Sequence, residues 1–295
     1  MLKEKDNNIY DLPREKWPQL LSRINDPPKR LRCIGTPPPH DVIYLTIIGS
    51  RLPTDYGRDS LNKLVAGLTG YPIVIVSGLA LGIDGMAHEA AMKAGLKTIS
   101  FPGSGLSRQA LYPAEHQNMA ERIVQADGCL LSEFPDNQEG VYWAFPQRNR
   151  LMAGSSVATL IIEGEMGSGS LITTRLALDY NRTVMALPGP IDSPLSAGPN
   201  SLIRDGAVPI TCVNDILHEL DIEPRDPNIA AISPERLAAL DPLSRKIFDS
   251  VSLQPRNKDD LCHELSLPMM ELNAFISLLE VDGLVRTKGN IIKRA

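Results

Sequence analysis

The chain has 295 residues, of which 43% are hydrophobic, and this length allows one large domain with a sizeable core and a smaller domain beside it. A formal net charge of −5 argues against indiscriminate nucleic-acid binding, although it permits a local basic groove. The four cysteines form no CxxC pair, and no apolar run approaches the roughly 20 residues that cross a bilayer. We therefore expect a cytoplasmic protein with reduced cysteines, no metal site and no membrane contact.

Residues 1–40 contain one short helical candidate, 17–24, and several prolines, so we expect an arm that packs on the next domain. A regular alternation of strands and helices then begins at Val42. Expected strands cover 42–48, 73–76, 97–101, 129–132, 158–162, 183–187 and 208–211, and expected helices cover 57–68, 84–94, 115–126, 171–181 and 213–220. Strands that alternate with helices at this spacing pair in parallel, so residues 41–222 predict a doubly wound, mostly parallel α/β sheet.

Small or polar residues stand where several of these strands end. In an open α/β sheet the strand exits share one edge, and ligands bind at that edge. A single glycine or serine there is often only a turn former. Several exits together, with arginines between them, favour a ligand site; they read Gly49-Ser50-Arg51, Ser77-Gly78, Gly103-Ser104-Gly105, Ser132-Glu133 and Glu163-Gly164.

The stretch from Phe145 to Leu187 gives the strongest local signal. A loop follows strand 158–162 directly and opens helix 171–181, so its backbone N–H groups and hydroxyls converge on a helix N-terminus. Such a place suits a phosphate. The loop residues that we expect to contribute are Gly167, Ser168, Gly169 and Ser170. Upstream, a short lead-in to the strand adds two positively charged side chains around an amide: Arg148, Asn149 and Arg150.

The arginines indicate which kind of phosphate ligand to expect. Arg51 follows the first strand, where a dinucleotide-binding protein has its glycine-rich turn, and neither GxGxxG nor GxxxxGK[ST] is present. Arg175 and Arg204 are further candidates for the same edge. Several separated phosphates suit this arrangement better than one pyrophosphate.

A set of ordered motifs resembles the DprA family (DNA-processing protein A, also called Smf). The motifs are GSR at 49–51, SGLALGIDGMAH at 77–88, SEFP at 132–135, FPQRNRLMAG at 145–154, SGSLIT at 168–173, ALPGPI at 186–191 and GPNSLIRDGA at 198–207. The resemblance implies a Rossmann-like core that binds and protects single-stranded DNA, forms a homodimer and helps load the RecA recombinase in natural transformation or homologous recombination. It implies neither an enzymatic activity nor a cofactor.

The resemblance also assigns site residues. It places Gly49, Ser50 and Arg51 in the phosphate-binding turn, and Ser77, Gly78 and Gly82 in a second glycine-rich turn. Phe145, Arg148, Asn149 and Arg150 match its FPxRNR segment. Arg51 and Arg148 would then hold phosphates, and Phe145 would stack on a base or pack in the core. Some relatives carry lysines where this chain has Leu81 and Ala114, so we expect DNA binding here to depend more on arginines.

Two other readings stay open at this stage. The same strand edge could serve a nucleotide-binding enzyme or nucleotide sensor, although GEMGSGSLIT only loosely resembles the PGGxGTxxE motif of phosphoribohydrolases. A transcription factor that senses a ligand is the third possibility. Among the residues that suggest catalysis, His88 stands alone and is interpreted as a packing residue, and Asp84 is expected to cap its helix.

The sequence changes character after residue 222. Residues 223–232 read as a polar linker, and residues 233–295 read as a winged helix with helices over 237–251, 258–265 and 268–281 and a hairpin over 283–292. The expected recognition helix contains no Lys or Arg. This favours an interaction with protein over the reading of a DNA groove.

Overall fold

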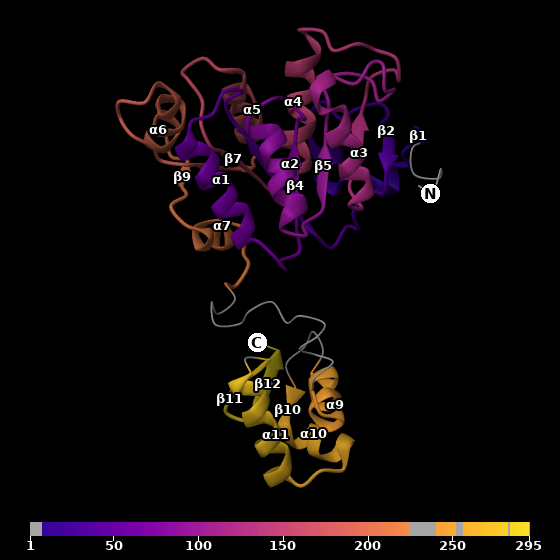
Figure 1. The fold of residues 1–295 in the computed structure, drawn as a ribbon, viewed down its shortest axis with the longest axis vertical. Helices are drawn as coiled ribbons and strands as arrows, with labels where there is room; N and C mark the ends of the chain where they lie inside the picture. Colours follow the sequence, from indigo (N-terminus) through magenta and orange to yellow (C-terminus); the bar gives the residue numbers. More distant parts are fainter. Residues whose placement is uncertain (1–7, 225–239, 252–255, 283, 295) are drawn as a thin grey trace. The chain divides into compact units, whose positions relative to one another are not determined.

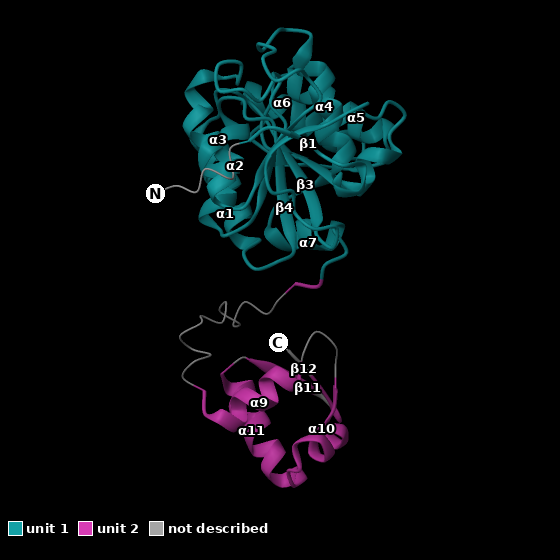
Figure 2. Ribbon diagram, turned by 90° about the vertical axis from the view of Figure 1, so that its right-hand side faces the viewer, with its two compact units in different colours: residues 1–222 teal, residues 223–295 magenta. Residues whose placement is uncertain are grey.

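The computed structural model describes residues 8–224, 240–251, 256–282 and 284–294, and the chain divides into two compact units, residues 1–222 and 223–295 (Figure 2). Most of the expected linker 223–232, and the first residues of the helix expected over 237–251, lie outside the described residues. Within the described ranges, no helix has both the length and the apolar character needed to span a bilayer.

The described part of the first unit contains one sheet of nine strands in the order β1-β2-β6-β5-β4-β3-β7-β8-β9. All pairings among β3 to β9 are parallel, whereas β1 and β2 join the β6 edge in antiparallel register. The mostly parallel α/β sheet that the sequence predicts is confirmed. The strands are β1 (Tyr10–Asp11), β2 (Arg32–Gly35), β3 (Ile43–Ile48), β4 (Ile73–Ser77), β5 (Thr98–Ser100), β6 (Cys129–Ser132), β7 (Ala158–Ile161), β8 (Thr183–Ala186) and β9 (Val208–Pro209).

The strand order reverses between β3 and β7. The chain proceeds outward from β3 through β4 and β5 to β6, and it then returns to place β7 on the other side of β3. Connections on the two sides of such a point leave the sheet in opposite directions, so a crevice opens at the carboxyl ends of the two strands. This topology positions the candidate site.

Helices cover both faces of the sheet (Figure 1). Leu45 and Ile47 of β3 lie in a core under α1, α2 and α7, whereas Tyr44 and Ile48 lie in a second core with α4, α5 and the N-terminal segment. Both faces of β3 are therefore buried, which explains its nearly continuous apolar sequence. The helices of this unit are α1 (Asp55–Gly67), α2 (Ile83–Lys93), α3 (Gln117–Gln125), α4 (Ala144–Ser155), α5 (Gly169–Asp179), α6 (Ala197–Arg204) and α7 (Val213–Glu219).

The N-terminal segment and the FPQRNR segment differ from the expectation. The expected arm contributes two strands to the sheet, and 3₁₀ turns replace the expected helix over 17–24. The expected lead-in is the twelve-residue helix α4, which tolerates Pro146 because the proline lies in the first turn, where no intrahelical N–H bond is lost. Leu21 and Ile24 approach this helix at Gly154, where a Cβ would crowd the Ile24 side chain.

The described residues of the second unit form three helices and a three-stranded antiparallel sheet in the order β10-β12-β11. Its core includes Phe248, Leu272 and Ile276. Leu278 and Val281 of α11 are exposed, so the outer face of the expected recognition helix is partly apolar. The elements are α9 (Pro242–Ser250), β10 (Arg256–Asn257), α10 (Lys258–Leu265), α11 (Met269–Val281), β11 (Val285–Lys288) and β12 (Ile291–Arg294).

His88 is a buried packing residue of α2. Its Nδ1–H donates to Thr98 Oγ1 at 2.6 Å, because the Thr98 hydroxyl itself donates to the Ile75 carbonyl at 2.8 Å. Burial lowers the pKa of His88 to about 3, and electrostatic interactions with His116 and Arg148 act in the same direction. The folded protein therefore holds His88 neutral, whereas the unfolded chain binds a proton below pH 6.5.

We expect His88 to make the protein sensitive to acid. The contribution of His88 to the free energy of unfolding is fully present above pH 6.5. It is lost progressively as the pH falls toward 3, because only the unfolded state gains the proton. The His88→Gln variant should lose less stability than the wild type between pH 6.5 and pH 4.5. Urea unfolding at a series of pH values measures this, and parallel losses in the two proteins would contradict it.

We also expect the N-terminal segment to be part of the core. Leu21 is completely buried, so Leu21→Ala should lower the free energy of unfolding by about 2–5 kcal/mol. Both tryptophans, Trp17 and Trp143, lie in the first unit, so their fluorescence during urea unfolding reports on this unit alone. Ile191→Ala is the matched control, because Ile191 is fully exposed and its loss should change stability by less than about 0.5 kcal/mol.

Candidate functional site

A groove of about 740 Å³ lies where the strand order reverses. We call it the main groove. The β3–α1 loop, helix α4, the β7–α5 loop and the segment before α6 form its walls. Many of the residues that the sequence proposes for the site line it: Gly49, Ser50, Arg51, Phe145, Arg148, Asn149, Ser168, Gly169 and Ser170.

Arg51 is the exposed cation of this groove. It follows β3, and its guanidinium lies 5.8 Å from the centre of the Phe145 ring. Phe145 is half-buried, and its other ring neighbour is Tyr112, with 5.4 Å between the ring centres. Among the residues that the structure describes, no acidic side chain forms an ion pair with Arg51. The guanidinium is therefore available to an anionic ligand.

Arg148 is also part of the groove wall, but it is buried. Its Nη1 donates to the backbone carbonyls of Gly78 and Phe101, at the ends of β4 and β5, and its Nε donates to Asn149 Oδ1 at 3.1 Å. Burial lowers the pKa of Arg148 to about 10, and the nearby Asp84 opposes this shift. Arg148 thus connects helix α4 to two strand-exit loops from inside the protein.

Asp84 is the counter-charge of this arrangement. The sequence predicts a helix cap at this residue, but that prediction is wrong, because α2 begins after Gly82 and Asp84 lies within its first turn. The carboxylate accepts a hydrogen bond from the Gly78 N–H at 3.1 Å. Burial raises the pKa of Asp84, while Arg148 and the backbone donors lower it. A buried carboxylate with these partners stabilises the loop after β4.

The second glycine-rich turn lies behind the groove surface. Ser77 is buried and donates its hydroxyl to the Ile47 carbonyl at 2.7 Å. A Cβ at Gly78 would overlap the Arg148 guanidinium, and a Cβ at Gly82, which has φ +76°, would overlap the Ser50 carbonyl. Gly78 thus leaves room for the Arg148 side chain and Gly82 for the backbone of the β3–α1 loop, so these residues affect the main groove through the loops that they position.

The N-terminus of α5 forms another part of the groove wall. The N-cap residue Ser168 makes no side-chain cap, and its hydroxyl bonds the Ser170 hydroxyl at 2.8 Å. Gly167 has φ +81°, which a glycine adopts without strain, and it turns the loop into the helix. Uncapped N–H groups at a helix N-terminus carry a partial positive charge, so an anion in the groove is stabilised here.

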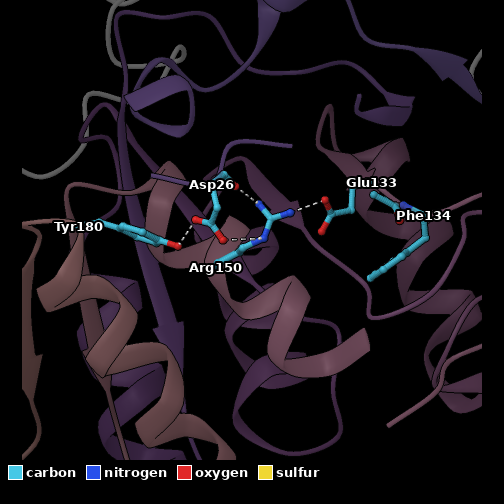
Figure 3. Close-up of polar contacts among 6 residues, drawn as sticks. Asp26, Glu133, Phe134, Arg150 and Tyr180 are labelled. Atoms are coloured by element: carbon cyan, nitrogen blue, oxygen red, sulfur yellow. Dashed lines mark hydrogen bonds and ion pairs between the residues drawn. The ribbon is translucent and has the colours of Figure 1, made fainter. Parts of the chain in front are cut away.

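Arg150 does not line the main groove, and its guanidinium lies between Asp26 and Glu133 (Figure 3). Its guanidinium forms ion pairs with Glu133, which follows β6, and with Asp26 of the N-terminal segment at 3.4 Å. The Tyr180 hydroxyl donates to Asp26 at 2.7 Å. Burial raises the pKa of Glu133, and Arg150 opposes this shift. Arg150 therefore connects the N-terminal segment, through Asp26, to the loop after β6, through Glu133.

Other proposed residues also lie outside the groove. Arg175 and Arg204 are exposed and do not line it. Glu163, at the end of β7, accepts hydrogen bonds from the backbone and hydroxyl of Thr54 at 2.9 and 2.5 Å. It therefore fixes the start of α1. No group of three potential metal ligands is found within the described ranges.

Sequence reasoning missed several exposed members of the groove, among them Leu52 and Tyr142. Leu52 directly follows Arg51, and Tyr142 stands three residues before Phe145 in a chain with only 5% aromatic residues. An aromatic side chain beside a motif in so aromatic-poor a chain was the available signal for Tyr142. Leu52 carries no such signal, because an isolated leucine is usually a core residue.

Comparisons with known proteins agree with this architecture. A family model described as DNA recombination-mediator protein A matches residues 8–221, and a model described as DprA winged helix domain matches residues 231–289. The DNA processing protein DprA of Bacillus subtilis is 38% identical over 224 residues, which cover 74% of this chain and 73% of that protein. Protein Smf of Escherichia coli is 36% identical over 219 residues, which cover 74% of this chain and 58% of that protein.

Two solved structures are similar as well. The structure of DprA from Streptococcus pneumoniae gives a TM-score of 0.67 at 36% identity and covers 73% of this chain and 75% of that chain. DNA processing protein A from Helicobacter pylori gives a TM-score of 0.64 at 31% identity and covers 73% of this chain and 98% of that chain. The latter structure is described in terms of a single-stranded DNA binding mode.

We expect Arg148 to be required for stability. Arg148→Ala leaves two buried carbonyls without their donor and removes the cation whose charge lowers the pKa of the buried Asp84, so the free energy of unfolding should fall by about 3–5 kcal/mol. The double variant Arg148→Ala, Asp84→Asn should lose less free energy of unfolding than the two single variants lose together. The reason is that Asp84→Asn removes the charge that Arg148→Ala leaves uncompensated. Urea unfolding followed by tryptophan fluorescence measures both effects. Strict additivity would argue against the coupling.

Proposed function

The chain belongs to the DNA recombination-mediator protein A family, and from this premise we propose that it binds single-stranded DNA in the main groove, chiefly through phosphates. The groove offers an exposed guanidinium and an uncapped helix N-terminus. Both groups favour negative charge. Contacts of this kind carry little base specificity, so we expect similar affinity for unrelated sequences.

The observation that carries this proposal is the state of Arg51. Its exposed side chain lines the groove without an acidic partner among the described residues, whereas Arg150 is ion-paired and Arg148 is committed to backbone carbonyls. An unpaired guanidinium at the switch point of an α/β sheet suits a ligand phosphate. The single-stranded DNA binding described for the Helicobacter pylori relative supports the same choice of ligand.

We further propose the cellular role that the family description suggests. In this role the protein acts as a homodimer in the cytoplasm, protects single-stranded DNA and presents it to the RecA recombinase during transformation or homologous recombination. The protein supplies binding and presentation without a chemical step. The winged helix unit would contact protein, because the described sequence of α11 contains Glu271 and Glu280 but no cation.

A free nucleotide is the second candidate ligand. The volume of the main groove falls within the range of small-molecule sites, and one phosphate could occupy the N-terminus of α5. An enzyme or sensor of nucleotides would then use this groove. Purified protein that retains absorbance at 260 nm after washing in high salt would favour this candidate over single-stranded DNA.

We expect Arg51→Ala to weaken the binding of unrelated single-stranded sequences about equally. Removing one phosphate contact should also reduce the slope of log affinity against log salt by about 0.7. Fluorescence-anisotropy titration of labelled oligothymidine and of a mixed sequence at several salt concentrations measures both quantities.

Arg175→Ala is the matched control for this experiment. Arg175 is an exposed arginine on α5 that does not line the main groove, so its loss should leave the affinity and the salt slope nearly unchanged. Equal effects of the two variants would mean that the net charge, and not the groove, controls binding. A loss with Arg51→Ala that depends on the base sequence would contradict phosphate recognition.

A further inference from the structure

We propose that the bound DNA strand crosses Arg51 and continues into a second groove, of about 480 Å³, between the β3–α1 loop and helices α2 and α3. This inference rests on the proposed function, because it extends the path of the same ligand. We call this space the second groove. It is lined by Arg51, Leu52, Pro53, Arg58, Gly82, Gly85, Met86, Glu89, His116 and Met119.

The two grooves share one boundary. Arg51 and Leu52 line both of them, and both side chains are exposed, so the loop after β3 forms a ridge between the grooves. A single nucleotide would occupy one side of this ridge. A polymer with regularly spaced phosphates can cross it and place a phosphate on Arg51 at the crossing point. The position of Arg51 therefore favours a strand over a mononucleotide.

The second groove has a cation of its own. Arg58, near the start of α1, pairs with Asp55 at 3.5 Å, but both side chains are about half exposed or more. An exposed ion pair of this kind contributes little free energy, so a phosphate can replace Asp55. Arg51 lies in the β3–α1 loop and Arg58 lies in the first turn of α1, and both line the second groove. They can thus bind successive phosphates.

The acidic residue of this groove is already neutralised. Glu89 of α2 pairs with Arg122 of α3 at 2.8 Å and with Lys93 at 3.8 Å. These cations, Arg122 foremost, lower the pKa of Glu89. The paired Glu89 carboxylate therefore repels a DNA phosphate in this groove less than an unpaired carboxylate would.

The remaining wall of the second groove is suited to packing against a DNA base. Met86 and Met119 are half-buried, and polarisable thioethers pack well against aromatic rings. Gly85 allows the His116 ring to lie close against α2, because a Cβ there would overlap the ring. The Nδ1–H of His116 donates to the Leu79 carbonyl at 2.7 Å, which leaves Nε2 as the ring nitrogen for a ligand. Helix α2, which carries Gly85 and Met86, lies side by side with α1, which carries Arg58 (Figure 1).

The test compares short and long oligothymidines, of about 4 and about 16 nucleotides, by fluorescence anisotropy. The proteins are the full-length wild type, Arg51→Ala, Arg58→Ala, Arg58→Glu and the control Arg175→Ala. Arg58→Ala should weaken binding of the long oligomer roughly three- to ten-fold and reduce its salt slope by about 0.7, and Arg58→Glu should weaken it further. Binding of the short oligomer should change less than two-fold in both variants, because the main groove alone accommodates it.

Three results would overturn the inference. If Arg58→Ala matches Arg175→Ala at both lengths while Arg51→Ala still weakens binding, the DNA is confined to the main groove and the proposed function stands. If the Arg58 variants weaken both lengths equally, Arg58 acts on the main groove from a distance. If the wild type binds neither oligomer, the proposed function fails as well. Unchanged urea midpoints confirm that the variants are folded, as expected for an exposed side chain.

Discussion

The buried guanidinium of Arg148 is the interaction on which the candidate site depends. It binds the carbonyls that end β4 and β5 from a position on α4, and Asp84 supplies the compensating charge from the first turn of α2. A charge is kept in a protein interior only where hydrogen bonds and a counter-charge offset its loss of water. Because those partners belong to separate loops, the hydrogen bonds of Arg148 also fix the distance between the loops.

The other arginines of the motifs have different partners and therefore different consequences. Arg150 is ion-paired with Glu133 and Asp26, so it holds the N-terminal segment against the sheet. Arg51 projects from the β3–α1 loop with no acidic partner among the residues described, and it lines both grooves. An arginine side chain therefore stabilises the interior, connects two segments or faces a ligand, depending on the residues around it.

Hydrophobic periodicity and strand-end composition predicted the central architecture. The strands from β3 to β8 were found within one or two residues because their apolar runs are bounded by Gly, Ser or Pro. Helix α4 was missed because a proline near its start and two arginines with a central asparagine do not form an amphipathic pattern. The strand β2 was missed because Arg32 and Gly35 do not read as strand residues, and only pairing with β6 makes them so.

What the sequence by itself determined is the order of elements, the mostly parallel sheet, the family and the edge at which polar residues gather, since these follow from local patterns and motif order. Only the tertiary structure decided the environment of each arginine. The sequence alone does not distinguish the environments of Arg51, Arg148 and Arg150. Burial and partners from distant segments, such as Phe101 for Arg148 and Asp26 for Arg150, make them different, because the free energy of a charge depends on what surrounds it.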